Sequence, residues 1–206
     1  MTGGARLLRA TIAGALALTL SACFQDTRPE GNNSAQAERL WQSRQAVLQQ
    51  IRVFALQGRM AETGLVSFSG DLTWTQNGSE FQARFYGPLG VGAVAISGNP
   101  DEMEIHNKNG TYHTQQPEAL MQEQFGWSVP VGPLRYWVLG LPAPSEQPPA
   151  VKLDESGRVL SLKQGGWELS YLEYQPATLL DLPRKFTISD GQRGFRVVID
   201  SWTSLR

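Results

Sequence analysis

The chain has 206 residues, of which 41% are hydrophobic and 18% charged, and its formal net charge is -1. These values predict one globular domain, and without a basic excess we expect no nucleic-acid partner. A single Cys and two His exclude a disulfide framework and leave little material for a metal site or for His-based acid–base chemistry. We therefore expect a protein that is not an enzyme and carries no metal or other cofactor.

The N-terminus has the pattern of a secretory signal. Arg6 and Arg9 precede an uncharged stretch, residues 10–24, which is shorter than the roughly 20 apolar residues of a membrane span. The sole Cys closes this stretch in Leu20-Ser21-Ala22-Cys23, which resembles the bacterial lipobox. The alternative is an ordinary secreted protein with a chance Cys at its cleavage site.

The lipobox implies that residues 1–22 are a lipoprotein signal peptide and that Cys23 carries a diacylglycerol and an N-acyl chain. The mature chain would then have 184 residues and a net charge of -3. Two or three acyl chains hold a protein on a membrane far more firmly than one. In lipoproteins of this type an Asp after the Cys signals retention in the inner membrane; Phe24 stands there, which implies the periplasmic face of the outer membrane. Residues 23–33 are predicted to be a lipidated flexible tether.

Residues 34–206 are predicted to form a single domain that begins with a helix. Ser34 is a good N-cap, and apolar residues at helical spacing predict an amphipathic helix as far as about Val53. Alternation of apolar and polar residues then indicates strands at 66–75, 81–85, 94–96 and 103–105. Asn77-Gly78 and Asn109-Gly110 are predicted hairpin turns.

The second half of the chain adds two short helices and more strands. We predict helices over 117–124 and 131–139, a Pro-rich linker over 142–149, and strands at 159–163, 167–174, 185–189 and 195–202. About ten hairpin-connected strands predict a mostly β protein of α+β architecture with one antiparallel sheet. A sheet this wide must curl, so we expect an unclosed half-barrel lidded by helices around a hydrophobic cavity. Alternation alone does not distinguish such a cavity from a filled core.

Several stretches resemble the LolB family of outer-membrane lipoproteins, in the same order along nearly the whole mature chain. They are the lipobox, the hairpin 65–85 with Gly87-Pro88-Leu89-Gly90, Gly126-Trp127 with Pro130, the run 134–142 (Leu-Arg-Tyr-Trp-Val-Leu-Gly-Leu-Pro) and the final strand 195–202. The family has an unclosed barrel of about eleven strands with helices over a hydrophobic cavity. The resemblance implies a receptor that accepts lipoproteins from the periplasmic carrier LolA and inserts them into the outer membrane.

The resemblance also implies site residues. Pro88, Leu89 and Gly90 match the loop whose protruding Leu delivers cargo to the membrane in LolB proteins. The alternative is a solitary surface Leu, which is common and needs no functional explanation. The candidate acyl-chain cavity is lined by aromatic residues, for which plain core packing is the alternative. These are Trp74, Phe81, Phe85, Trp127, Trp137, Trp167 and Phe195.

The two His residues are candidate metal ligands. His106 and His113 flank Asn109-Gly110 symmetrically and would face each other across a two-residue hairpin, with Glu104 nearby. Since a third ligand is not evident, we interpret them as a surface pair without metal.

Two other functions are compatible with the sequence. One is a structural or assembly lipoprotein of the outer membrane that binds another envelope protein through a sheet with a filled core. The other is a periplasmic hydrolase, against which the lack of a nucleophile motif counts. The leading prediction is a monomeric receptor whose partners are LolA, cargo lipoproteins and outer-membrane lipid.

Overall fold

A computed structural model describes residues 33–63, 69–87, 93–99, 101–126 and 128–206. Their strands form one antiparallel eleven-stranded sheet in the order β6-β5-β4-β3-β2-β1-β11-β10-β9-β8-β7. The helices are α1 (Ala35–Leu48), α2 (Pro117–Phe125) and α3 (Val131–Trp137). The strands are β1 (Val53–Thr63), β2 (Ser69–Asn77), β3 (Glu80–Tyr86), β4 (Val94–Gly98), β5 (Met103–Asn107), β6 (Gly110–Thr114), β7 (Ala150–Leu153), β8 (Val159–Gln164), β9 (Trp167–Gln175), β10 (Leu182–Ser189) and β11 (Gly194–Thr203). The predicted mostly β, unclosed antiparallel sheet with helices is confirmed.

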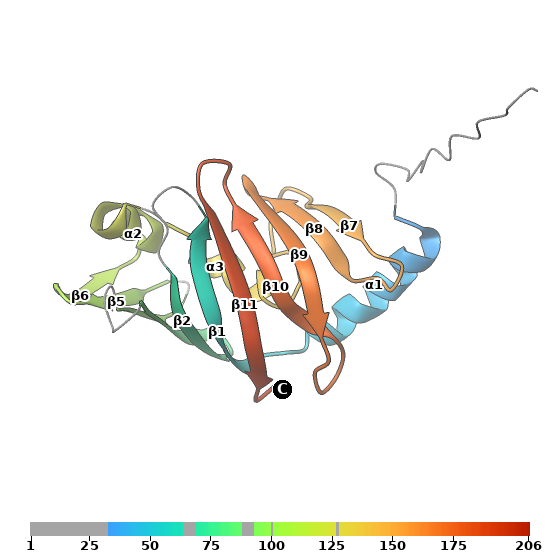
Figure 1. Ribbon diagram of the computed structural model, residues 1–206, viewed down its shortest axis with the longest axis horizontal. Coiled ribbons are helices and arrows are strands. Elements are labelled where there is room, and N and C mark those ends of the chain that lie inside the picture. The colour runs from blue at the N-terminus through green and yellow to red at the C-terminus, as the bar shows by residue number, and fades with distance from the viewer. Residues whose placement is uncertain (1–32, 64–68, 88–92, 100, 127) are drawn as a thin grey trace, which may run out of the picture. The chain divides into compact units, whose positions relative to one another are not determined.

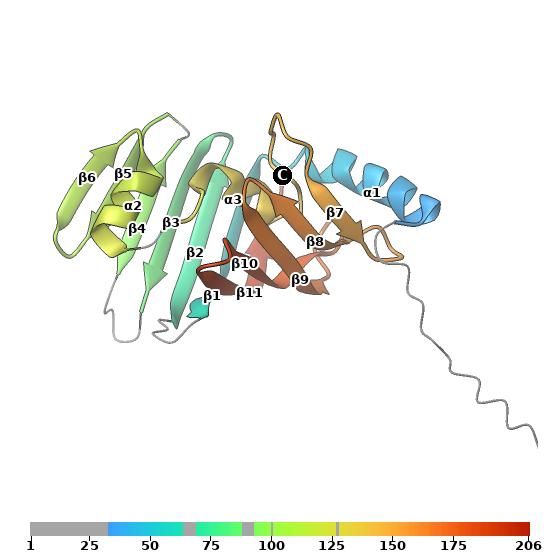
Figure 2. The ribbon, with the colours of Figure 1, turned by 90° about the horizontal axis from the view of Figure 1, so that it is seen from above.

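The position of the helices follows from the strand order. β1–β6 and β7–β11 are two meanders joined where β1 pairs with β11, so the consecutive strands β6 and β7 are the two opposite edges of the sheet. The chain between them must cross from one edge to the other, and it forms α2 and α3 on the way. Figures 1 and 2 show both helices over the concave face of the curled sheet, with α1 at the β7 end. None of the described helices is long and apolar enough to cross a membrane.

Alternation sorts the side chains onto the two faces of the sheet. The strand register places Trp74, Ala83, Ile96 and Ile105 in one row across β2–β5. This row faces the helices, and Ile105 is fully buried. The neighbouring row on the outer face is polar and consists of Thr75, Gln82, Ser97, Glu104 and His113. The sequence pattern therefore determines which face becomes the core.

The first helix is shorter than predicted. The Ser34 hydroxyl accepts the Ala37 N–H at 3.0 Å as an N-cap, but α1 ends at Leu48 rather than near Val53. Residues from Val53 onward are β1, a central strand paired with both β2 and β11. The helix packs closely on the β7–β8 turn, where Gly157 has a φ of +71° and a Cβ would lie 2.6 Å from the Trp41 nitrogen. A side chain at Gly157 would therefore push the helix away.

The strand prediction needs further corrections. The sequence analysis missed β1 and the short edge strand β7, so that eleven strands stand where about ten were expected. The first two hairpins exist, but Asn77 pairs with Glu80 and Asn107 with Gly110, so the turn centres are 78–79 and 108–109. Gly165 and Gly166 form the turn between β8 and β9, and both have the positive φ that a tight hairpin turn requires.

Candidate functional site

An apolar cavity lies between the concave face of the sheet and α3. Its wall includes Met60, Leu72 and Trp74 from the first two strands and Phe186, Ile188, Phe195 and Val197 from the last two. Ala83, Phe85, Val94 and Ile96 continue the wall over β3 and β4, and Val131, Leu134 and Val138 close it from the helix side. No backbone polar group has to face this space, because strand pairing and helix formation satisfy these groups internally. The cavity is therefore suited to a long apolar group.

The cavity is nearly filled by its own side chains in this conformation. Its free volume is about 90 Å³, whereas pockets that hold drug-sized ligands measure about 300–1,000 Å³. Three wall residues, Val131, Leu134 and Val138, belong to α3 or its end. An acyl chain therefore requires α3 to move away from the sheet, and the contacts that hold α3 decide how readily this happens.

The predicted cavity residues fall into three groups. Trp74, Phe81, Phe85 and Phe195 are brought together around the cavity. Trp137 and Trp167 are not among the residues that line this cavity, and their rings contact each other at a centroid distance of 6.4 Å. Trp127, Cys23 and the loop residues Pro88, Leu89 and Gly90 lie outside the described residues.

Gln164 ties α3 and the following linker to β8. The side chain is only 8% exposed, and its Oε1 accepts both the Trp137 indole N–H at 3.0 Å and the Ala143 N–H at 2.9 Å. Its Nε2 donates to the Ala143 carbonyl at 2.7 Å. A single buried amide thus satisfies three groups that would otherwise lack partners.

Tyr171 and Glu118 hold the two ends of the same helix. The Tyr171 hydroxyl donates to the Trp137 carbonyl at 2.8 Å at the C-terminal end. Burial raises the pKa of this phenol well above its ordinary value, and the neighbouring Tyr174 raises it further, so the hydroxyl keeps its proton and remains a donor. At the N-terminal end, Glu118 of α2 accepts the Val131 N–H at 3.1 Å, which supplies the cap that Pro130 lacks. The two lid helices are therefore connected.

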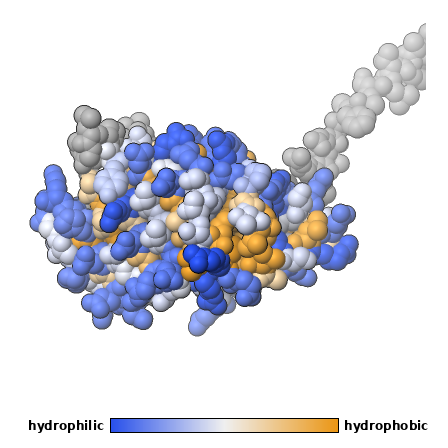
Figure 3. Space-filling view, turned by 90° about the horizontal axis from the view of Figure 1, so that it is seen from below, coloured by the Kyte–Doolittle hydropathy of each residue, from blue (hydrophilic) through white to orange (hydrophobic). Residues whose placement is uncertain are grey.

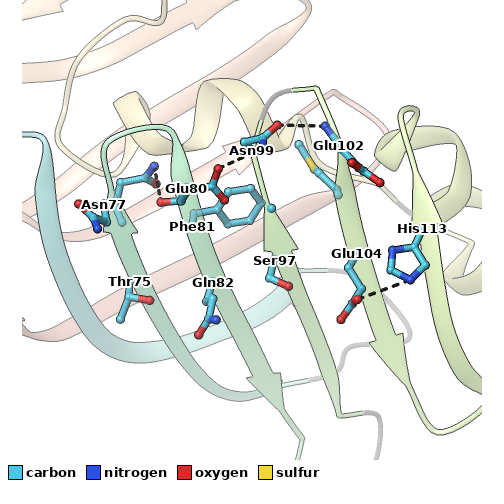
Figure 4. Close-up of a pocket in the computed structure, with 13 residues that line it drawn as sticks. Thr75, Asn77, Glu80, Phe81, Gln82, Ser97, Asn99, Glu102, Glu104 and His113 are labelled. Carbon is cyan, nitrogen blue, oxygen red and sulfur yellow. Dashed lines mark hydrogen bonds and ion pairs between the residues drawn. The ribbon is translucent and has the colours of Figure 1, made fainter.

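One larger hollow on the surface has a different chemistry. A groove of about 500 Å³ lies over β2–β6, and Figure 4 shows its polar side chains, with Glu104 and His113 facing each other. Its acidic residues Glu80, Glu102 and Glu104 are unsuited to an acyl chain. Seen from below in Figure 3, the described surface is largely polar, with apolar atoms gathered in separate patches. The apolar cavity is thus the candidate site despite its small volume.

The predicted pairing of the two His residues is wrong. Because the turn is centred one residue earlier, His106 lies opposite Thr111, and its Nδ1 is 2.8 Å from the Thr111 hydroxyl. His113 lies opposite Glu104, with 3.7 Å between Nε2 and Oε2. Within the described ranges, no three His, Cys, Asp or Glu side chains are grouped to hold a metal ion.

The sequence analysis missed the aliphatic part of the wall. It restricted the cavity to aromatic residues, although the same alternation places Ala83 between Phe81 and Phe85 on the inner face of β3. Including every inward position of the predicted strands would have found Ala83, Val94 and Ile96. The role of Gln164 has no local signal, because its partners Trp137 and Ala143 are more than 20 residues away in sequence.

The architecture has a counterpart among solved structures. A crystal structure of a LolA superfamily protein from Nitrosomonas europaea matches with a TM-score of 0.53 over 82% of this chain and 93% of that chain, at 9% sequence identity. At this identity the match shows the fold alone. Together the curled sheet, the helical lid and the apolar cavity define an open half-barrel protein whose fold is similar to that of this LolA superfamily protein.

Sequence comparison identifies the family within this class. The family model described as outer membrane lipoprotein LolB matches residues 52–202. The outer-membrane lipoprotein LolB of Nitrosococcus oceani is 38% identical over 90% of this chain and 92% of its own length. The protein of the same name from Alkalilimnicola ehrlichii is 36% identical over 95% of this chain and 96% of its own length. The chain belongs to the LolB family, as its sequence motifs predicted.

Proposed function

We propose that this protein is the outer-membrane receptor that accepts lipoproteins from the carrier LolA and inserts them into that membrane. The observation that carries the proposal is the apolar cavity between Trp74, Phe195 and α3 in a chain of the LolB family. Such walls bind acyl chains by the hydrophobic effect, at about 0.8 kcal/mol per buried methylene, and need no polar recognition.

The direction of transfer requires only a difference in affinity. An acyl chain passes from a weaker to a stronger apolar site without an energy source, because equilibrium depends on the free-energy difference alone. Opening of α3 exposes the cavity, and closure excludes water once the chain is inside. No chemical step on the cargo is needed, which agrees with a protein that is not an enzyme.

The proposal includes the anchor. Acyl chains on Cys23 hold the domain on the periplasmic face of the outer membrane through the tether 23–33. A coil of about ten residues spans roughly 20 Å or less, so the cavity stays close to the lipid into which cargo is delivered. The domain itself acts as a monomer.

A transfer assay tests this function. LolA loaded with a fluorescently labelled lipoprotein is mixed with a Cys23→Ala form of the protein, and the new partner of the label is identified by size-exclusion chromatography. Movement of the lipoprotein onto the protein is expected. If the label stays on LolA while circular dichroism shows a folded sheet, the receptor function is refuted and an assembly role for the same fold replaces it.

Replacing Leu89 separates uptake from delivery. We expect Leu89→Glu to accept cargo within about twofold of the wild-type rate but to deliver it to liposomes at least about tenfold more slowly, because a carboxylate at this position resists entry into lipid. Release of the label into liposomes measures delivery. The matched control is Leu172→Glu in β9, where a Leu that is 54% exposed undergoes the same change. Normal delivery by Leu89→Glu would show that this loop does not deliver cargo to the membrane.

A further inference from the structure

A second hollow shares α3 with the apolar cavity. It is a groove of about 480 Å³ between the end of α1, the start of β1, α3 and the Pro-rich linker. α3 contributes Arg135 and Tyr136 to this groove, whereas its residues Val131 and Leu134 line the cavity. One short helix therefore forms part of both walls, and we call this hollow the α3 groove.

The α3 groove combines apolar walls with two guanidinium groups. Its apolar lining comes from the end of α1, the start of β1 and the segment after α3, and consists of Leu48, Ile51, Phe54, Leu139, Leu141 and prolines of the linker. Arg52 and Arg135 also line it, and none of its lining residues is Asp or Glu. It thus differs from the groove over β2–β6, whose lining includes three Glu.

The charges of these two arginines are not neutralised by the described part of the chain. Neither guanidinium forms an ion pair with a described carboxylate, and the Cζ of Arg135 lies 4.8 Å from the centroid of the Tyr136 ring. An oxygen of the Arg206 carboxyl group lies close to Arg52, but it accepts the backbone N–H groups of Arg52 and Val53 rather than a guanidinium. The α3 groove is therefore complementary to an anion.

The walls of the α3 groove favour an anion that carries apolar chains. Guanidinium groups bind phosphate through paired, charge-assisted hydrogen bonds, and apolar walls bind the methylenes of an acyl chain by the hydrophobic effect. A phospholipid has both chemistries, and the outer membrane for which the family is named supplies it. The lipid on a lipoprotein Cys has no phosphate, so the two arginines do not serve the cargo lipid. An acidic peptide matches the two charges but leaves the apolar walls without a partner.

We propose that the α3 groove binds a membrane phospholipid, with Arg52 and Arg135 on its phosphate and the start of its acyl chains on the apolar walls. This goes beyond the proposed function, because it gives the protein a lipid ligand other than its cargo. α3 is also the helix that must move to open the cavity, so lipid of the target membrane contacts this helix directly. Phospholipid and cargo are thus bound on different faces of one helix.

Three soluble ligands separate a phospholipid from a free phosphate. The Cys23→Ala protein is titrated with dihexanoyl phosphatidylglycerol below its micelle concentration, with dihexanoylglycerol and with inorganic phosphate, and backbone amide NMR locates the binding. We expect saturable shifts at Arg135 and Tyr136 with the phospholipid, and at least about tenfold weaker binding of the other two, since each lacks one half of the chemistry. The absence of saturable binding, equal binding of either comparison ligand, or shifts confined to cavity residues such as Ala83 and Ile96 overturns the proposal.

Arginine variants test the two charged residues. Arg52→Gln and Arg135→Gln are each expected to weaken phospholipid binding by about tenfold, whereas the matched control Arg39→Gln, an exposed arginine of α1 outside the groove, should stay within about twofold. Arg135 also lies in the last turn of α3, where a positive charge stabilises the helix end. A lower free energy of unfolding with unchanged lipid binding would give Arg135 that structural role alone and overturn the proposal. The three-ligand titration uses the Arg52 and Arg135 side chains as they are and decides the question if a variant fails to fold.

An acidic peptide is the alternative occupant of the α3 groove. Polyglutamate that displaces phosphatidylglycerol from Arg135 and Tyr136 at a lower concentration than the lipid itself needs would replace the phospholipid with an acidic protein partner. Uptake of cargo from LolA separates this site from the proposed function. Phospholipid binding without uptake refutes the receptor function and leaves the site standing, whereas uptake without phospholipid binding does the reverse.

Discussion

Ala83→Trp is expected to close the cavity to acyl chains. Ala83 is the small residue in the inner row between Trp74 and Ile96, and its side chain faces α3 across the cavity. An indole there occupies the free volume of about 90 Å³ and extends toward Leu134 and Val138 on the opposite wall. Because new apolar contacts replace empty space, the free energy of unfolding should stay the same or rise, unless the larger ring overpacks the wall.

Binding of a fluorescent fatty acid measures this effect. We expect the affinity of Ala83→Trp to fall by at least about tenfold and transfer from LolA to fall with it. Ala95→Trp is the matched control, because Ala95 is similarly half-buried but lies opposite Arg84 and His106 on the outer face. Equal binding by both variants would show that acyl chains bind elsewhere, and the groove in Figure 4 or a surface patch would have to be considered.

The parts of the fold that are predictable from sequence are those with a local cause. Alternation along β2, β3 and β9 is visible within each strand, and Pro117 at the first turn of α2 marks a helix start in the sequence itself. The curled sheet with a helical lid then follows from strand number and connection length. For this reason the fold class was correct before any tertiary contact was known.

The missed elements depend on distant partners. Ile51 and Phe54 continue the helical spacing of α1. From Val53 onward, however, pairing with β2 and with β11, about 140 residues away, is more stable than a longer helix. Strand pairing with such remote residues has no local signature. The site residues depend on distant partners in the same way. The local sequence does not distinguish Trp74 from Trp137, yet Trp74 lines the cavity, whereas Trp137 is 1% exposed and packs on Trp167.

Removing the amide of Gln164 should produce the largest loss of stability. Gln164→Leu keeps most of the volume but leaves the Trp137 indole N–H without an acceptor in a site that is 1% exposed. The Ala143 N–H and carbonyl also lose their partner, although this half-buried residue can recover some bonding from water. At about 1–3 kcal/mol for each unsatisfied buried group, we expect the free energy of unfolding to fall by about 2–4 kcal/mol.

Denaturant unfolding of a graded set of variants isolates the cause. Trp137→Phe removes one donor while Gln164 still bonds to Ala143, so its free energy of unfolding should fall by less than that of Gln164→Leu. The control Gln82→Leu makes the same change on the exposed outer row, and its free energy of unfolding should stay within about 0.5 kcal/mol of the wild-type value. Because Gln164 also holds the end of α3, its replacement should weaken the attachment of this helix and increase the rate of fatty-acid entry. A destabilised protein with unchanged entry rate would mean that α3 opens about other contacts, with Tyr171 and Glu118 as the remaining attachments.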